Sequence, residues 1–283
     1  PRYFGSDPDP RLFSFADDYC EGARALVGSV QQHARPPLLT EPLPDPRADP
    51  TAATQLSLDR LLRFFRMPAA DLVKRRLGVF LGDLRRDHSD REPMELGGLD
   101  AWRLGDRMLE HGQRALDPSR SLTLTRAEGM LPLGTPGRSR HDDVSRNVAP
   151  LLSRTGRLRE GEPLPNLEID LQLGTTRLVG TVDARWPAAR SLVQDAILSP
   201  KHRLSAWIAH LCLCAMDPGD QELRSVIVAR GRDPGTAELC EFEPVTPAAA
   251  LLADLVELYW LGQQEPLLLF PRASYVYCQA LRE

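Results

Sequence analysis

Two acidic residues occur where neighbouring strands could present them to a metal ion. Asp183 lies in the alternating stretch 177–185, and Asp195 lies in the apolar stretch 191–198, which follows a Pro-Ala-Ala turn. Two carboxylates on adjacent strands can hold one or two divalent ions for phosphodiester cleavage. Such a site also needs a lysine two residues after the second acid, to polarise the phosphate and position the attacking water. The residues around Asp195 therefore show whether this chemistry is present.

The required lysine is missing in both possible registers of the second strand. If Asp195 is the second acid, the lysine position holds Ile197. If the register is one residue earlier, Gln194 replaces the acid and Ala196 replaces the lysine. We therefore predict a degenerate site near Asp183 and Asp195, with no catalytic residue, no metal and no cofactor. Asp183 is then a relic or a hydrogen-bonded structural acid.

A rearranged metal site is the alternative. It would gather four residues around a divalent ion: His141, Asp183, Asp195 and Lys201. Lys201 lies beyond the strand, at the start of the next helix. His141 is followed by two aspartates, and acidic residues are favoured near a helix N-terminus. We therefore interpret His141 as a polar helix start, and favour a domain without activity of its own over a divergent nuclease.

The periodicity of the chain predicts an α/β fold. Alternating stretches rich in β-branched residues predict five strands: 166–173, 177–185, 191–198, 223–230 and 237–242. We expect 177–185 and 191–198 to form a hairpin. Apolar residues at helical spacing predict helices: 17–30, 57–78 with a break at Met67-Pro68, 99–116, 141–152, from Pro200 onward, 246–261 and 272–281. Glycines and prolines predict a loop at 127–137. We expect a mixed central sheet of about five strands flanked by helices.

A proline-rich stretch divides the chain. Six prolines fall between residues 35 and 50, and proline lacks the N–H that helices and sheets use, so we predict an extended linker over 35–55. Residues 1–34 are expected to be the tail of a preceding domain, and residues 56–283 to form the main domain. The chain begins at Pro1 without a methionine, which suggests a piece of a longer protein.

The composition is typical of a globular protein. Of 283 residues, 42% are hydrophobic and 26% are charged, and the net charge of −4 argues against coating of nucleic acid by charge alone. No apolar run is long enough to cross a membrane, and no signal segment opens the chain. Five scattered cysteines form no ligand-spaced set, so we expect reduced thiols and a cytoplasmic location.

A group of cations, here called the basic set, crowds the helices of 57–78 against only two aspartates. Its members are Arg60, Arg63, Arg66, Lys74, Arg75 and Arg76. The basic set either contacts DNA phosphates or forms a solvated helix face, and the sequence favours neither. In the first case, neutralising Arg63, Lys74 and Arg75 together is predicted to weaken the binding of a DNA strand.

The helices around Met67-Pro68 resemble the entry to the nuclease-like domain of the RecB and AddB group. Iron–sulfur members of that group carry a cysteine at this step, and thiolates hold such clusters, so the resemblance implies no cluster here. Further segments are similar to the C-terminal part of the RecC family: 92–110, 126–134, 201–211 and 270–275. The resemblance covers residues 12–280.

The resemblance implies a PD-(D/E)XK, restriction-endonuclease-like core that no longer cuts. RecC is the gamma subunit of the RecBCD helicase–nuclease, exodeoxyribonuclease V, which repairs double-strand breaks by homologous recombination. The implied partners are RecB-like and RecD-like subunits and DNA, as single strands and duplex ends, with no membrane. The implied role is subunit assembly together with strand separation and guidance. The apolar faces of 247–261 and 267–270 either meet a partner or are internal core.

Overall fold

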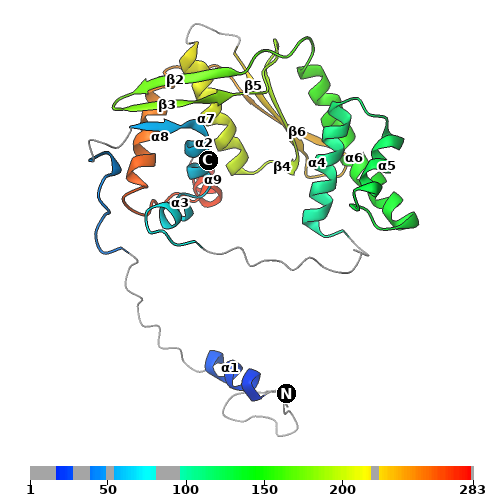
Figure 1. Ribbon diagram of the computed structural model, residues 1–283, viewed down its shortest axis with the longest axis horizontal. Coiled ribbons are helices and arrows are strands. Elements are labelled where there is room, and N and C mark those ends of the chain that lie inside the picture. The colour runs from blue at the N-terminus through cyan, green and yellow to red at the C-terminus, as the bar shows by residue number, and fades with distance from the viewer. Residues whose placement is uncertain (1–16, 28–38, 49–53, 81–95, 218–222, 282–283) are drawn as a thin grey trace. The chain divides into compact units, whose positions relative to one another are not determined.

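The computed structural model describes residues 17–27, 39–48, 54–80, 96–217 and 223–281 (Figure 1). Its contacts divide the chain into two units, residues 1–42 and residues 43–283. The helix described in the first unit is α1 (Asp17–Val27). The second unit holds both sheets and every candidate site residue.

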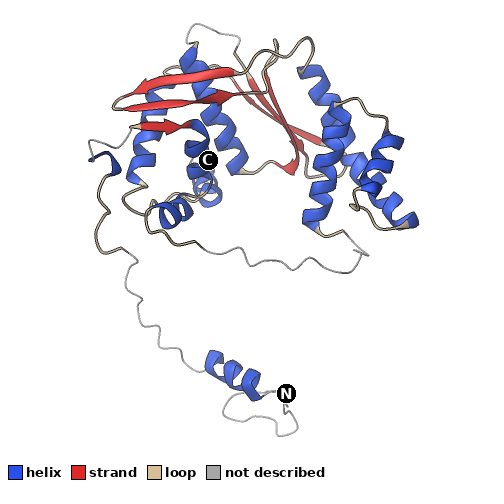
Figure 2. Cartoon of the chain, in the orientation of Figure 1, coloured by secondary structure: helices blue, strands red, loops and turns tan. Residues whose placement is uncertain are grey.

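The strands of the described residues form two mixed sheets of three strands each (Figure 2). In the first sheet, β3 (Thr176–Val182) is central. It runs parallel to β1 (Gln55–Ser57) and antiparallel to β2 (Leu167–Leu173). Gly174 closes the β2–β3 turn with a φ of 58°, a conformation that glycine adopts without strain. The predicted pairing of 166–173 with the strand that follows is confirmed.

The second sheet is built around β5 (Ser225–Arg230), which is almost entirely buried. β5 runs parallel to β4 (Arg190–Ile197) and antiparallel to β6 (Ala237–Phe242). Alternate residues of β5 face different cores: Val226 and Val228 pack against one helical group, and Ile227 packs in another cluster. A continuous apolar run is expected for a strand covered on both faces.

The predicted hairpin of 177–185 with 191–198, and the single sheet of about five strands, are wrong. The segment after β3 meets the start of β4 at a bridge between Arg185 and Arg190, and the Ser191 N–H donates to the Ala184 carbonyl at 2.8 Å. β3 and β4 themselves belong to different sheets. Ala184 adopts a left-handed φ of 58°, which turns the chain out of the extended path directly after β3. β4 pairs instead with β5, because the buried backbone of a central strand needs partners on both sides.

The break at Met67-Pro68 is confirmed. Ser57 caps α2 (Leu58–Arg66) by accepting a hydrogen bond from the Arg60 N–H at 3.3 Å. Pro68 begins α3 (Pro68–Arg75), where its missing N–H costs nothing. The face of α2 that packs in the first core is Leu58, Leu61, Phe64 and Phe65.

Three helices, α4 (Gly98–Gln113), α5 (Pro118–Ala127) and α6 (Gly134–Leu158), form a helical group beside the second sheet (Figure 1). The predicted loop at 127–137 is therefore shorter, and α5 was not predicted. The Asp117 side chain caps α5 by accepting from the Ser119 N–H at 2.8 Å. Pro136 falls in the first turn of α6, where a helix tolerates proline.

Helix α7 (Pro200–Met216) packs between the two sheets and is buried around most of its circumference. Ile208 and Leu211 belong to the core of the first sheet, whereas Ala206 packs with the second. Two helices follow the sheets, α8 (Ala248–Leu261) and α9 (Pro271–Ala280). Of the helices within the described ranges, none is both long and apolar enough to span a bilayer.

His210 of α7 is fully buried and hydrogen-bonded at both ring nitrogens. Nε2–H donates to the Glu243 carbonyl at 2.8 Å, which leaves Nδ1 to accept from the Ser225 hydroxyl at 2.9 Å. The neutral ring, which burial favours, satisfies both hydrogen bonds in this way. Burial lowers the pKa of His210 below its ordinary value of 6.5, and burial also lowers the pKa of His141 and His202.

We expect stability to fall as the pH drops below 6.5. The unfolded histidines take up protons there while the folded rings resist, so acid favours the unfolded state, by at most about 1.4 kcal/mol per pH unit for each ring. Urea unfolding at pH 7.5, 6.5 and 5.5 measures this slope, and His210→Gln should flatten it. Burial raises the pKa of Asp195 above its ordinary value of 3.8. This carboxyl therefore lowers the stability as the pH rises above 3.8, which opposes the effect of the histidines. An equal slope in the variant would contradict the assignment.

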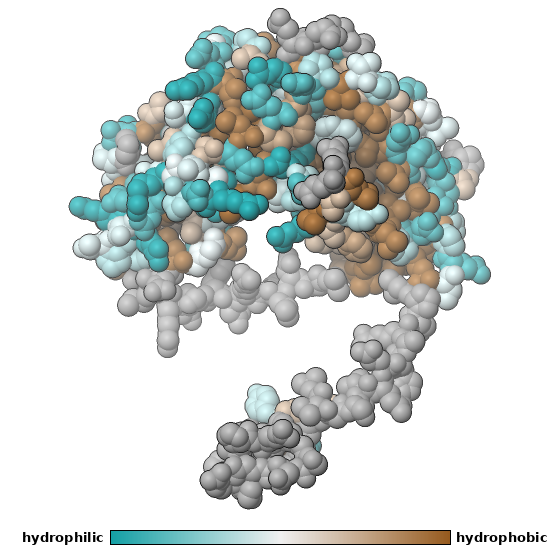
Figure 3. Space-filling view, turned by 180° about the vertical axis from the view of Figure 1, so that it is seen from behind, coloured by the Kyte–Doolittle hydropathy of each residue, from teal (hydrophilic) through white to brown (hydrophobic). Residues whose placement is uncertain are grey.

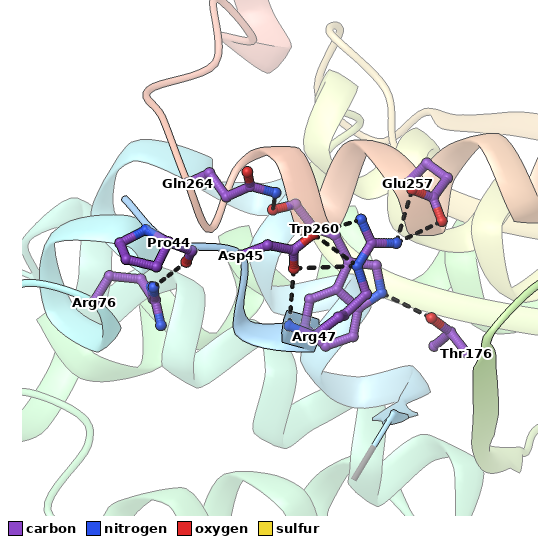
Figure 4. A network of polar contacts seen from close by, with 8 residues as sticks. All are labelled: Pro44, Asp45, Arg47, Arg76, Thr176, Glu257, Trp260 and Gln264. Atoms are coloured by element: carbon purple, nitrogen blue, oxygen red, sulfur yellow. Dashed lines mark hydrogen bonds and ion pairs between the residues drawn. The ribbon is translucent and has the colours of Figure 1, made fainter. Parts of the chain in front are cut away.

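Residues 43–48, inside the predicted linker, are bonded to α8 (Figure 4). Arg47 forms ion pairs with Asp45 at 3.0 Å and with Glu257 at 2.8 Å, and its guanidinium carbon lies 5.6 Å from the Trp260 ring centroid. The Trp260 indole N–H in turn donates to the Thr176 hydroxyl at 2.9 Å. This network ties the segment entering the second unit to both α8 and β3.

Candidate functional site

Asp183, the first candidate acid, follows β3 directly and pairs with Arg190 at the start of β4. Arg190 Nη2 lies 3.4 Å from Asp183 Oδ1, and Arg190 Nε donates to the Asp183 carbonyl at 3.1 Å. The arginine side chain is only 8% exposed, and burial lowers its pKa. The guanidinium therefore stands beside Asp183 as its counter-charge, and a cation there disfavours a metal ion.

Asp195, the second candidate acid, is 1% exposed and packs against α4. Its Oδ1 lies 3.5 Å from Arg230 Nη1, while Oδ2 has no hydrogen-bond partner among the described residues. Burial raises the pKa of this carboxyl. Gly105 of α4 is so close that an added Cβ would lie 1.7 Å from Oδ2. Asp195 is therefore a closed, buried group that substrate does not reach.

The two acids do not converge. Gln194, the residue before Asp195, points to the other face of β4 and donates to His202 Nδ1 of α7 at 2.9 Å. Asp195 faces α4, on the side of the helical group. Burial raises the pKa of the Cys212 thiol of α7, and Arg190, which pairs with Asp183, lies near enough to oppose that rise. The buried partner of Asp183 thus lies toward α7, whereas Asp195 lies against α4.

The remaining members of the rearranged site lie elsewhere. His141 is a buried residue in the interior of α6, which begins at Gly134, so its interpretation as a polar helix start is wrong. It lines a hollow of about 140 Å³ within the helical group, together with His111 and Ser121. Lys201 lies in the first turn of α7. Within the residues that the structure describes, no three side chains of the histidine, cysteine, aspartate and glutamate types gather as a metal ion would require.

Four members of the basic set are engaged within the chain. Arg63 and Arg75 pair with aspartates one turn earlier on their own helices, Arg75 at 2.8 Å. Arg76 donates to the Pro44 carbonyl at 2.6 Å (Figure 4) and to the Gln263 carbonyl at 3.0 Å. Arg60 lies with its guanidinium carbon 5.5 Å from the ring centroid of Tyr259.

Arg66 and Lys74, the other two members, are exposed. Lys74 Nζ lies 5.7 Å from the Phe80 ring centroid. Arg66 ends α2 and, with Lys201, adds to the lowering of the His202 pKa that burial mainly causes. Arg66 at the end of α2 and Lys201 at the start of α7 therefore lie close to the same histidine and form one cationic surface. In the sequence, the run Pro-Lys-His-Arg at the start of α7 indicates the contribution of Lys201 to this surface.

Arg190 is the residue that sequence reasoning missed. It occupies the first position of β4 in the run Ala-Arg-Ser-Leu-Val. An arginine at the start of an apolar strand indicates a charge that the fold buries. Because arginine is almost never fully buried unless it is paired, it also indicates an acidic partner nearby. Its partner, Asp183, is the acid that the sequence singled out for a different chemistry.

Comparison with known proteins shows the family. The family model described as the RecC C-terminal domain matches residues 53–282. The chain belongs to the RecC C-terminal domain family. It is 32% identical over 272 residues to the RecBCD enzyme subunit RecC of Mycolicibacterium smegmatis, covering 95% of this chain and 24% of the relative. The same subunit of Mycobacterium tuberculosis is 30% identical over 232 residues, covering 82% of this chain and 21% of the relative.

The chain thus spans about a quarter of the length of these RecC relatives. The part that matches the RecC family model runs from just before β1 to the end of α9. A crystal structure of a "Putative exonuclease" from Eubacterium rectale aligns with a TM-score of 0.41 at 9% identity, covering 75% of this chain and 83% of that one. That likeness is too weak to carry an argument. Of the resembling segment 92–110, residues 92–95 lie outside the described residues.

Proposed function

We propose that this chain is the nuclease-like C-terminal domain of a RecC subunit, and that it supports assembly and guides DNA strands without cutting them. The observation that carries the proposal is the pairing of Asp183 with the buried Arg190, while Asp195 is closed off against α4. In a cleaving PD-(D/E)XK site both acids would face one metal ion. Here one acid neutralises an arginine and the other is buried in a core.

The assembly would be a helicase–nuclease of the RecBCD type, exodeoxyribonuclease V, with RecB-like and RecD-like subunits. The curated relatives are named subunits of the RecBCD enzyme, and this supports the partners proposed here. Cutting and unwinding would then belong to the other subunits, in double-strand-break repair by homologous recombination. The cytoplasm is the expected compartment.

The strand contact is assigned to Arg66, Lys74 and Lys201. Arg66 and Lys74 are exposed, and Lys201 is half-buried at the start of α7. Of the other members, Arg63 and Arg75 pair with aspartates, and Arg76 donates to two carbonyl oxygens. Arg60 is half-buried against the Tyr259 ring, whereas Lys74 is exposed although it lies beside Phe80. Cations without a carboxylate partner attract phosphate most strongly, because no internal pair has to be broken.

Asp183→Ala in the full-length protein, assembled with its partner subunits, tests the proposal. We expect the rate of DNA cleavage by the complex to stay within about twofold of the parent, because Asp183 holds no metal in this account. A loss of about a hundredfold or more, with the complex intact by size-exclusion chromatography, would favour the divergent nuclease. Asp170→Ala, which removes an exposed aspartate paired with Arg177, is the matched control.

A further inference from the structure

An apolar groove of about 500 Å³ opens between α7, β6 and α9. Leu204 and Trp207 of α7, Cys240 and Phe242 of β6, and Tyr275 of α9 line it. α9 has no buried residue, and it exposes aromatic and aliphatic side chains beside the groove. Figure 3 shows hydrophobic side chains gathered on the half of the molecule that carries α7, α8 and α9. Exposing the apolar surface of this groove to water costs free energy, and such surfaces often mark sites of interaction.

The wall of the groove formed by β6 is an open sheet edge. β6 pairs with β5 on one side and, among the described strands, has no neighbour on the other. Its register with β5 is unbroken from Ala237 to Phe242, without a bulge. Proteins usually protect such edges with charged residues, above all lysine, or with proline or a bulge. β6 carries two glutamates but no lysine, proline or bulge. The backbone groups on the outer side of β6 therefore have no strand partner among the described residues.

The charged residues of β6 itself are acidic. The charged residues of β6 are Glu238 and Glu241, and exposed Glu243 follows the strand. Arg203 of α7 bonds Glu238 at 2.7 Å, and Arg224 pairs with Glu241 at 3.2 Å, although the Glu241 side chain remains about half exposed. An added strand would meet Leu239 and Glu241 on one face and the groove on the other, because successive side chains alternate across a sheet.

We propose that the groove binds an extended segment of another subunit, which adds to the second sheet beside β6. Its apolar side chains would enter the groove over Trp207 and Phe242, and a lysine or arginine on its other face would lie opposite Glu241. Main-chain hydrogen bonds would supply affinity, and the groove would supply specificity for alternate side chains. This inference rests on the proposed function, since it requires partner subunits.

Native cysteines make the inference testable. Cys278 of α9 lines the groove and is exposed, whereas Cys240 is half-buried and burial raises the pKa of its thiol. Cys278 should therefore react first with a maleimide. We expect its labelling, followed by peptide mass spectrometry, to slow by about tenfold or more in the assembled complex relative to the separated full-length protein. Thr123→Cys, on the exposed side of α5, reports labelling away from the groove.

Two tyrosines of α9 give a matched pair of variants. Tyr275 lines the groove and is 36% exposed, whereas Tyr277 is 66% exposed and lies outside the groove lining. Tyr275→Asp should restore fast labelling of Cys278 in the complex, and Tyr277→Asp should leave it slow. A benzophenone maleimide on Cys278 should cross-link to a partner segment in which apolar residues alternate with lysine or arginine.

Several results would overturn the inference. If the complex assembles and Cys278 reacts as fast as in the separated protein, the groove is empty and only this inference fails. Cross-links to a second copy of this chain, to its own upstream residues, or to a helical partner segment would also exclude the proposed occupant. If no complex with partner subunits forms at all, the proposed function fails together with the inference.

Discussion

Gly105→Ala is expected to lower the free energy of unfolding by about 2 kcal/mol. The new Cβ would lie 1.7 Å from Asp195 Oδ2 and 2.6 Å from its Cγ. Alanine in a helix interior otherwise gains about 0.5–1 kcal/mol over glycine, so the clash must outweigh a favourable propensity. The carboxyl has little room to retreat, because Asp195 is 1% exposed. Urea unfolding of the two proteins measures the difference.

A double-mutant cycle separates the clash from other effects of the new methyl group. In the Asp195→Ala background the neighbouring carboxyl is gone, and Gly105→Ala should become neutral or stabilising, a coupling of about 2–3 kcal/mol. Gly156→Ala in α6 is the matched control, because no atom lies within 4 Å of its added Cβ. It should be neutral or slightly stabilising. An equal loss from Gly105→Ala in both backgrounds would show that Asp195 is not packed against α4.

Replacing Arg66, Lys74 and Lys201 together with glutamine should weaken binding of single-stranded DNA by the assembled complex by about tenfold or more at low salt. Each lost phosphate contact lowers the magnitude of the salt slope by about 0.7 for a single strand, so the slope should fall by about 2. Fluorescence anisotropy with a labelled oligothymidine between low and moderate salt measures both quantities.

The control removes the same charge from elsewhere. Arg154 and Arg157 of α6 and Arg232 after β5 are exposed, and replacing all three with glutamine should leave the salt slope unchanged. Equal weakening by the two triple variants would reduce the effect to net charge and exclude a local strand contact. Neutralising Arg63, Lys74 and Arg75 together is a weaker test, because Arg63 and Arg75 are paired with Asp59 and Asp71.

Local periodicity was sufficient for most of the elements. The strands at 166–173, 223–230 and 237–242 occur within two residues of the predicted bounds, because alternation and composition are properties of the segment itself. The sequence did not predict α5, because its segment lacks a clear apolar face and only the Asp117 cap and the Pro118 start mark it as a helix. The pairing of β4 with β5 could not be predicted from the segment alone, because strand partners are chosen by tertiary contacts.

For the candidate site too, the sequence identified the residues but not their tertiary contacts. The sequence identified Asp183 and Asp195 and showed that no lysine follows at the required spacing. It could not show which face of β4 carries Asp195, because the register of β4 shifts between Gln194 and Ile197. It also gave no reason to join Asp183 to Arg190, whose approach depends on the left-handed turn at Ala184.

The most direct test of a nuclease-like domain without a working site is calorimetric titration of Mn²⁺ and Mg²⁺ into the chain, beside a cleavage assay on single-stranded DNA. With Arg190 as the counter-charge of Asp183, and Asp195 closed off by α4, we predict no saturable binding heat and no cleavage. Tight Mn²⁺ binding that disappears in Asp183→Ala, together with cleavage, would contradict the account and would mean that other residues have rebuilt a catalytic metal site.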